Sequence, residues 1–112
     1  MRGRPPDVVI RQFDVFANPS LRSRDEAPFV VVLQSHHAGE LPTAVVAPLY
    51  RREAFPLLTR LTVEVERDGQ DLILSIPELV ALNSSLLHKK VGSLVEHEDA
   101  IRRALDRLFT GF

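Results

Sequence analysis

The sequence contains no cysteine and no tryptophan among its 112 residues, and only one methionine and one tyrosine. The absence of cysteine excludes disulfides, thiolate zinc sites, iron–sulfur clusters and cysteine nucleophiles. Core packing alone must hold the fold, which is typical of proteins in a reducing cytoplasm. No apolar run reaches the length of about 18 residues that a membrane span needs, and the first residues lack the apolar stretch of a signal peptide. We therefore expect a cytoplasmic protein without membrane contact.

A large excess of either charge is also missing, because 14 basic and 15 acidic side chains give a formal net charge of −1. Proteins that bind duplex DNA or RNA usually need a basic face that displaces counterions. We expect no direct binding to nucleic acid by this chain alone. Apolar residues make up 45% and charged residues 26%, and the length suits one hydrophobic core, so the composition is that of an ordinary single-domain globular protein.

Short apolar runs separated by turn residues predict a mainly β fold. Strands are expected at residues 8–16, 28–33, 43–49 (ended by Pro48), 61–66 and 72–76. Asp68 and Gly69 lie between the last two strands. Asp-Gly at this position predicts a two-residue hairpin, because a type I′ turn needs positive φ at both central residues.

The end of the chain predicts an amphipathic helix over about residues 96–110. Acidic side chains lie in its first turn, where the helix dipole favours negative charge, and Gly111 suits the position that terminates a helix. Apolar side chains recur at helical spacing and predict one buried stripe, consisting of Ile101, Ala104, Leu105, Leu108 and Phe109.

Residues 77–90 fit either a helix or strands. Their leucines and valines could form one helical face, and Pro77 would suit a first turn. The Asn-Ser-Ser segment at residues 83–85 argues against an unbroken helix, because these side chains compete for backbone hydrogen bonds. The pattern alone does not decide between the two structures.

Three polar clusters contain residue types that can carry chemistry. His36, His37 and Glu40 could bind a metal, but neighbouring residues on a strand point to opposite faces. The His-Glu-Asp segment at residues 97–99 could be a metal or acid–base cluster, but it also suits the start of a helix. The His-Lys-Lys segment at residues 88–90 could contact phosphate, but short basic runs are usually solvated. We interpret all three as solvated surface segments and expect no metal or cofactor.

A fourth cluster could surround a phosphodiester. Arg51, Arg52 and Arg60 are basic, and a nuclease would also need a general base such as Glu53, Asp68 or a histidine. Nothing in the spacing singles out one base, and the sequence has no phosphate-binding glycine loop or nucleophile elbow. We therefore expect no catalytic site.

Three segments resemble the CcdB toxin family. Residues 11–16 (Arg-Gln-Phe-Asp-Val-Phe) are similar to its opening strand, a Gln-Phe-Lys-Val-Tyr-like motif, and residues 45–49 resemble its Val-Ile-Pro-Leu strand. Residues 99–112 resemble its closing helix, which ends in Phe-Trp-Gly-Ile. The resemblance extends over residues 11–112, so residues 1–10 are interpreted as a flexible extension and the rest as one toxin domain.

The resemblance implies an SH3-like barrel of antiparallel strands with a small accessory sheet and one C-terminal helix, and it favours strands for much of residues 77–87. It also implies a homodimeric toxin of a type II toxin–antitoxin system, neutralised by the disordered tail of a cognate antitoxin and repressing its own operon in that complex. Family members trap DNA gyrase on cleaved DNA by binding its A subunit, without catalysis or cofactor.

The gyrase contact attributed to the family is a C-terminal Trp-Gly-Ile, which maps onto Thr110, Gly111 and Phe112. Gly111 matches, Phe112 replaces one apolar residue by another, and Thr110 replaces the tryptophan. Tryptophan is a common hot-spot residue, whose truncation can cost about 2–4 kcal/mol of binding energy. Two alternatives stay open: an endoribonuclease of the related barrel superfamily that uses Arg51 or Arg52, and a non-toxic relative that binds an antitoxin or represses an operon.

Overall fold

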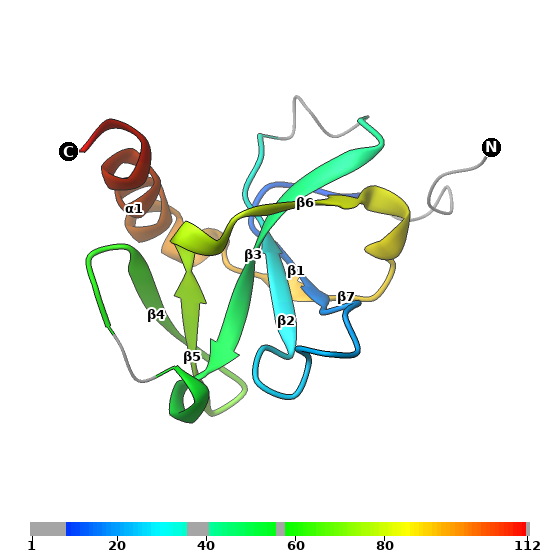
Figure 1. Ribbon diagram of the computed structural model, residues 1–112, viewed down its shortest axis with the longest axis horizontal. Helices are drawn as coiled ribbons and strands as arrows, with labels where there is room; N and C mark the ends of the chain where they lie inside the picture. Colours follow the sequence, from blue (N-terminus) through cyan, green and yellow to red (C-terminus); the bar gives the residue numbers. More distant parts are fainter. Residues whose placement is uncertain (1–8, 36–40, 56–57, 112) are drawn as a thin grey trace.

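The computed structural model describes residues 9–35, 41–55 and 58–111. Their strands pair antiparallel in one sheet, in the order β4-β5-β3-β2-β1-β7, with β6 also paired to β3. The sheet curls into a half-barrel, and helix α1 packs beside β4 and the 3₁₀ turn η3 (Figure 1). The expected mainly β fold with one C-terminal helix is confirmed. The strands and helix are β1 (Asp14–Ala17), β2 (Phe29–Val32), β3 (Thr43–Arg51), β4 (Thr62–Arg67), β5 (Gln70–Ser75), β6 (Val80–Asn83), β7 (Lys90–Ser93) and α1 (Glu98–Thr110).

Among the described residues, 3₁₀ turns connect these elements at η2 (Arg52–Ala54), η3 (Ile76–Glu78), η4 (Ser84–Leu86) and η5 (Val95–His97). Within the described ranges, no helix is both long and apolar enough to cross a membrane.

Strand β3 is the centre of the sheet and is longer than the sequence indicated. It runs on to Arg51, so the expectation that Pro48 ends the strand is wrong. One side of β3 pairs with β2, while the other pairs first with β6, through residues 43–46, and then with β5, through residues 49–51. Pro48 lies in the gap between these two partners. A strand tolerates proline where no ladder hydrogen bond needs its missing N–H, which explains its place here.

The β4–β5 hairpin agrees with its prediction. Asp68 and Gly69 have φ values of 53° and 79°, the positive values that a type I′ turn requires. Val63 and Val65 are buried on one face of β4, and the glutamates between and after them are exposed. Local sequence is enough to specify this part of the fold.

The first strand starts later than predicted. Residues 9–13 are not in a strand, and Phe13 has a φ of 73°, a left-handed conformation that is uncommon for a residue with a side chain. Its backbone is held on both sides, because its N–H donates to the carbonyl of Val32 over 2.7 Å and its carbonyl accepts from Leu94 N–H over 2.8 Å. Its ring is buried in the core. Long-range contacts therefore override the extended preference of the local sequence.

Residues 77–90 form strands and turns, as the family resemblance favoured. Strand β6 covers residues 80–83, and β7 starts at residue 90. Asn83 ends β6 by accepting a 3.0 Å hydrogen bond from Ser85 N–H, which caps η4. The Asn-Ser-Ser segment therefore makes a turn, and an unbroken helix is excluded.

The core consists of two clusters on opposite faces of the sheet. Neighbours in β1 show the division, because Val15 belongs to the cluster under α1 and Phe16 to the other. Ile10 also packs in the second cluster, although the sequence interpretation placed it in the extension. Residues 1–8 lie outside the described residues, so the domain boundaries remain a prediction.

One arginine side chain joins the two outer strands of the curled sheet. Arg67, at the end of β4, donates to the carbonyl of Val91 in β7, and its guanidinium lies 5.6 Å from the centroid of the Phe29 ring. A Cβ on Gly92 would overlap this guanidinium. Glycine at position 92 therefore makes room for a contact that spans the open side of the half-barrel.

Candidate functional site

Helix α1 changes its surroundings along its length. Ile101 and Ala104 are buried in the core, and Leu105 and Leu108 are partly buried against it. Phe109 is 68% exposed, so its predicted place in a buried stripe is wrong. At 3.6 residues per turn, Phe109 lies about 80° around the helix axis from Ile101, far enough to leave the face that meets the sheet.

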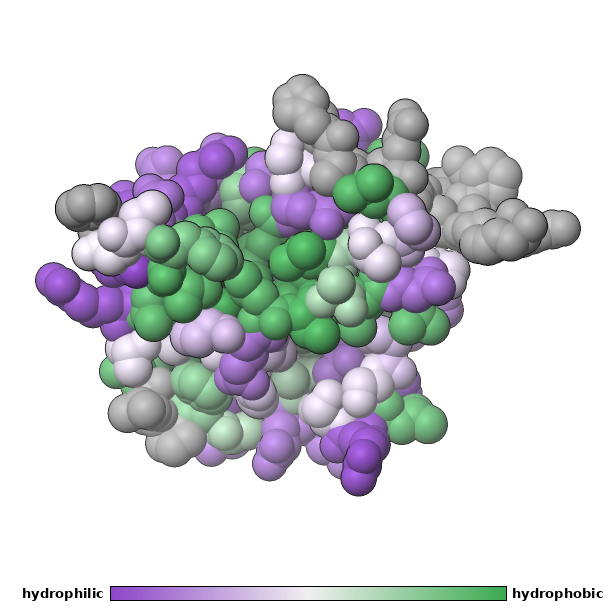
Figure 2. Space-filling model, turned by 45° about the horizontal axis from the view of Figure 1, so that its top comes forward, coloured by the Kyte–Doolittle hydropathy of each residue, from purple (hydrophilic) through white to green (hydrophobic). Residues whose placement is uncertain are grey.

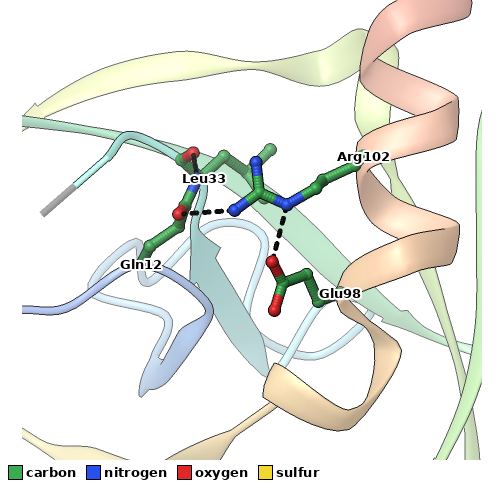
Figure 3. Close-up of polar contacts among 4 residues, drawn as sticks. All are labelled: Gln12, Leu33, Glu98 and Arg102. Atoms are coloured by element: carbon green, nitrogen blue, oxygen red, sulfur yellow. Dashed lines mark hydrogen bonds and ion pairs between the residues drawn. The ribbon is translucent and has the colours of Figure 1, made fainter.

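The N-terminal half of α1 is held by polar contacts as well as by burial (Figure 3). Arg102 Nε donates to Glu98 Oε2 over 2.7 Å, and Arg102 Nη2 lies 3.5 Å from Gln12 Oε1. Gln12 in turn donates through Nε2 to the carbonyl of Leu33 over 2.9 Å. The guanidinium of Arg102 also lies 5.6 Å from the centroid of the Phe13 ring, within cation–π range. These contacts tie the helix to the segments that precede β1 and follow β2.

The C-terminal end of α1 satisfies its own polar groups and leaves the side chains exposed. Gly111 adopts a left-handed φ of 82° and donates its N–H to the carbonyl of Arg107 over 3.0 Å, as the predicted terminating residue does. The hydroxyl of Thr110 donates to the carbonyl of Asp106 over 2.6 Å. Thr110 and Gly111 are both exposed, and Phe112 lies outside the described residues.

The predicted site residues Thr110 and Gly111 follow Phe109 in the chain, and all three are exposed. The sequence interpretation assigned Phe109 to the core and missed it as a surface residue. One feature of the sequence could have indicated its exposure. Phe109 is the last residue of the apolar stripe and follows Leu108, which still packs against the core.

Apolar side chains also remain accessible around β6. Figure 2 shows them as a green band that crosses the face on which β6 lies and continues to the α1 side of the molecule. Strand β6 pairs only with β3, so its other edge has no partner strand among the described residues. We call this surface the apolar band. The larger apolar side chains of β6 and α1 that stay at least partly exposed are Val80, Leu82, Leu105, Leu108 and Phe109.

A tyrosine–glutamate pair fixes the turn on which α1 rests. Tyr50 donates to Glu78 Oε1 over 2.6 Å, and Ser75 donates to Glu78 Oε2 over 2.7 Å. Burial, followed by the hydrogen bond and negative charge of Glu78, raises the pKa of Tyr50 to about 12. Tyr50 therefore stays a protonated donor at neutral pH. No sequence pattern indicated this pair, because its members lie 28 positions apart.

The basic residues considered for a nuclease make separate structural contacts. The guanidinium of Arg51 donates to the carbonyl of Asp25 over 2.7 Å, and the carbonyl of Arg60 accepts from Arg107 over 3.1 Å. Arg52 lies in η2 with Glu53 and lines a hollow that also contains the acidic side chains of Glu64, Glu66 and Asp71. Asp68 forms the hairpin turn. An acidic hollow is unsuited to a phosphodiester, so this arrangement does not favour the nuclease interpretation.

The histidine clusters fall in two different places. His36, His37 and Glu40 lie outside the described residues. Glu98 is bound to Arg102, and Asp99 is exposed in the first turn of α1, as expected for charges that complement the helix dipole. In the part of the chain that the structure describes, no group of three or more His, Cys, Asp or Glu side chains could hold a metal.

Comparison with known proteins places the chain in a family. No curated protein has a sequence that matches it. The sequence model of the family described as "CcdB protein" matches residues 12–111, nearly the whole chain, including every strand and α1. The chain therefore belongs to the CcdB family, whose members are toxins of toxin–antitoxin systems.

Proposed function

We propose that this protein is a gyrase poison that acts by binding, with the C-terminal end of α1 as its contact surface. Thr110, Gly111 and Phe112 would touch the gyrase A subunit and stabilise its complex with cleaved DNA. No cofactor and no catalytic residue takes part. The observation that carries the proposal is the exposure of Phe109, Thr110 and Gly111 at the end of a helix whose other end is firmly held.

The physical chemistry of this helix end suits a binding role. An exposed aromatic ring on a rigid helix supplies contact area with little loss of conformational freedom on binding. Aromatic residues dominate the energetics of many interfaces. Thr110 has no ring to supply, and its hydroxyl is already bound to the carbonyl of Asp106. We assign the aromatic contribution to Phe109 and Phe112, on either side of Thr110 and Gly111.

A homodimer is the proposed form of the toxin. The apolar band provides the surface, because a contiguous exposed apolar patch on a globular protein usually marks an interaction site. A two-fold axis would bring the part of the band on β6 against the same part of a second copy, and Phe109 at the end of α1 would stay free for the gyrase contact. Light scattering should give twice the monomer mass of 12.6 kDa. A monomer at all concentrations would contradict this part of the proposal.

The remaining features of the proposal concern the partner and the domain limits. A cognate antitoxin with a disordered tail would neutralise the toxin, and their complex would repress its own operon in the cytoplasm. Residues 1–10 would be an extension to a toxin domain of residues 11–112.

A growth-arrest assay tests the proposal. Expression of the full chain should stop growth, and deletion of residues 110–112 should restore it. A deletion of residues 2–4 is the matched control, because it removes the same length of chain from the proposed extension and should leave growth arrest intact. Undiminished toxicity of the 110–112 deletion would rule out this contact surface.

A further inference from the structure

One cavity on the described surface is lined by basic side chains. Its volume is about 380 Å³, and it lies between the end of β1, the loop before β2 and the segment before β7. Three basic side chains line it, from Arg24, His88 and Lys89. No carboxylate is among the described residues that surround it, and the rest of its wall is formed by Ala17, Asn18, Pro19, Pro28 and Leu86.

Hydrogen bonds hold the backbone that carries these basic side chains. Asn18 is buried, and its amide donates to Ser23 Oγ over 3.0 Å and to the carbonyl of Ala27 over 2.8 Å, which holds the loop containing Arg24. On the opposite wall, the carbonyl of Lys89 accepts from Ala17 N–H over 3.0 Å. The end of β1 is therefore hydrogen-bonded to both walls of the cavity, which limits the distance between them.

The basic run of residues 88–90 divides into two parts. Lys90 forms a 3.2 Å ion pair with the buried carboxylate of Asp14, so its charge serves the fold. Lys89 and His88 face the cavity instead. Among the described residues, no ion pair is formed by Arg24, His88 or Lys89. Two cations and an imidazole without counter-charges therefore line one hollow.

This arrangement selects for a particular kind of anion. A guanidinium, an ammonium and an imidazole together offer more donors than one carboxylate can accept, whereas a phosphate monoester carries three terminal oxygens and about −1.5 to −2 charge at neutral pH. The cavity also exceeds the size of a bare phosphate and falls within the range of small-molecule pockets, roughly 300–1,000 Å³. Its apolar wall, which includes the half-exposed Leu86, would cover the organic part of the ligand.

We propose that this cavity is a binding site for a phosphate monoester with a small organic group, such as a mononucleotide. A long nucleic acid fits less well, because the chain has a net charge of −1 and tracking a phosphate backbone needs an extended basic surface. The site is independent of the C-terminal end of α1, and the proposal stands apart from gyrase poisoning.

Calorimetric titration of the full chain with AMP tests the site, with adenosine, inorganic phosphate and a short 5′-phosphorylated DNA strand as comparison ligands. AMP should bind and adenosine should not, because the phosphate provides the charge. Replacing Arg24 and Lys89 by glutamine should weaken AMP binding about ten-fold for each cation removed, the size expected for one charge-assisted hydrogen bond. Tighter binding of the DNA strand, lost in the same variants, would assign the phosphate to a strand end.

Arg22→Gln is the matched control, because Arg22 lies in the same loop, is exposed and does not line the cavity. It should leave AMP affinity unchanged. Equal weakening by Arg22→Gln and Arg24→Gln would reduce the effect to general surface charge and overturn the proposal. Absence of AMP binding, or binding that survives the Arg24 and Lys89 substitutions, would also overturn it. All these positions are exposed, so the substitutions should leave the fold intact. Circular dichroism of each variant verifies its fold, and growth arrest provides a second check.

Discussion

The two halves of α1 differ in burial and in the partners of their polar groups. In the N-terminal half, Ile101 is completely buried and Arg102 reaches Glu98, Gln12 and the Phe13 ring. In the C-terminal half, the polar groups of Thr110 and Gly111 bind only within the helix, and Phe109 is exposed. One half is packed against the rest of the fold, and the other presents side chains to solvent.

This difference suggests that folding and target binding use separate residues of one helix. A rigid N-terminal half removes most of the entropic cost of presenting the C-terminal end to a partner. Substitutions in the two halves should therefore affect different measurements, stability for one and growth arrest for the other.

The largest effect on stability is expected for Ile101→Ala. Removal of a buried isoleucine side chain costs about 2–5 kcal/mol, because it loses apolar burial and leaves a cavity. Urea unfolding of the purified protein measures this cost. Phe109→Ala is the control and should change the free energy of unfolding by no more than about 0.5 kcal/mol, as for other exposed sites. A large cost for Phe109→Ala would break the proposed division.

Two glycines with positive φ offer a matched pair. An added Cβ at Gly69 or Gly111 would meet no atom within 4 Å, so alanine at either position strains only the backbone, by about 1 kcal/mol. Thermal unfolding should show similar losses for Gly69→Ala and Gly111→Ala. Only Gly111→Ala should weaken growth arrest, because only Gly111 belongs to the proposed contact. Equal loss of toxicity in both variants would point to stability as its cause.

A smaller loss is expected for Arg102→Met, which keeps the aliphatic part of the side chain and removes its polar contacts. Arg102 is more than half exposed, so its ion pair with Glu98 is worth less than about 1 kcal/mol. The difference in unfolding free energy between variant and wild type should shrink at high salt. A loss as large as that of Ile101→Ala would mean that polar contacts, and not burial, hold this half of the helix.

The smallest effect on stability is expected at Tyr50, which holds the turn under α1, and it depends on pH. The pKa of Tyr50 is raised from 10.0 to about 12, so between these values the folded chain keeps a proton that the unfolded chain has lost. Its contribution to stability is complete below pH 10 and declines as the pH rises toward 12. Tyr50→Phe should therefore make the alkaline fall in unfolding free energy less steep. The same slope in both proteins would contradict the assignment.

Local patterns were sufficient for the parts of the fold in which neighbours along the chain decide the structure. Asp68 and Gly69 specify their own turn, and the spacing of Ile101, Ala104 and Leu108 specifies a helix. Elsewhere distant segments decide. Phe13 is left-handed because Val32 and Leu94 hold its backbone, and Pro48 remains in a strand because β3 changes partners there.

Family resemblance assigned Thr110 and Gly111 to the proposed contact, and that assignment stays a prediction. Helical periodicity assigned Phe109 to the core, since the pattern does not show where the supporting sheet ends. The cationic cavity was also beyond the sequence, because Arg24 and Lys89 are separated by 64 intervening positions and meet only through the pairing of β1 with the segment before β7.

The affinity of the purified toxin for the isolated gyrase A subunit tests the central claim most directly. Calorimetry should show binding by the full chain and a loss of roughly 30-fold or more when residues 110–112 are deleted, the size expected when hot-spot contacts are removed. The unfolding midpoint should hardly change. Unaltered affinity of the deleted protein, or no binding by the full chain, would contradict the account.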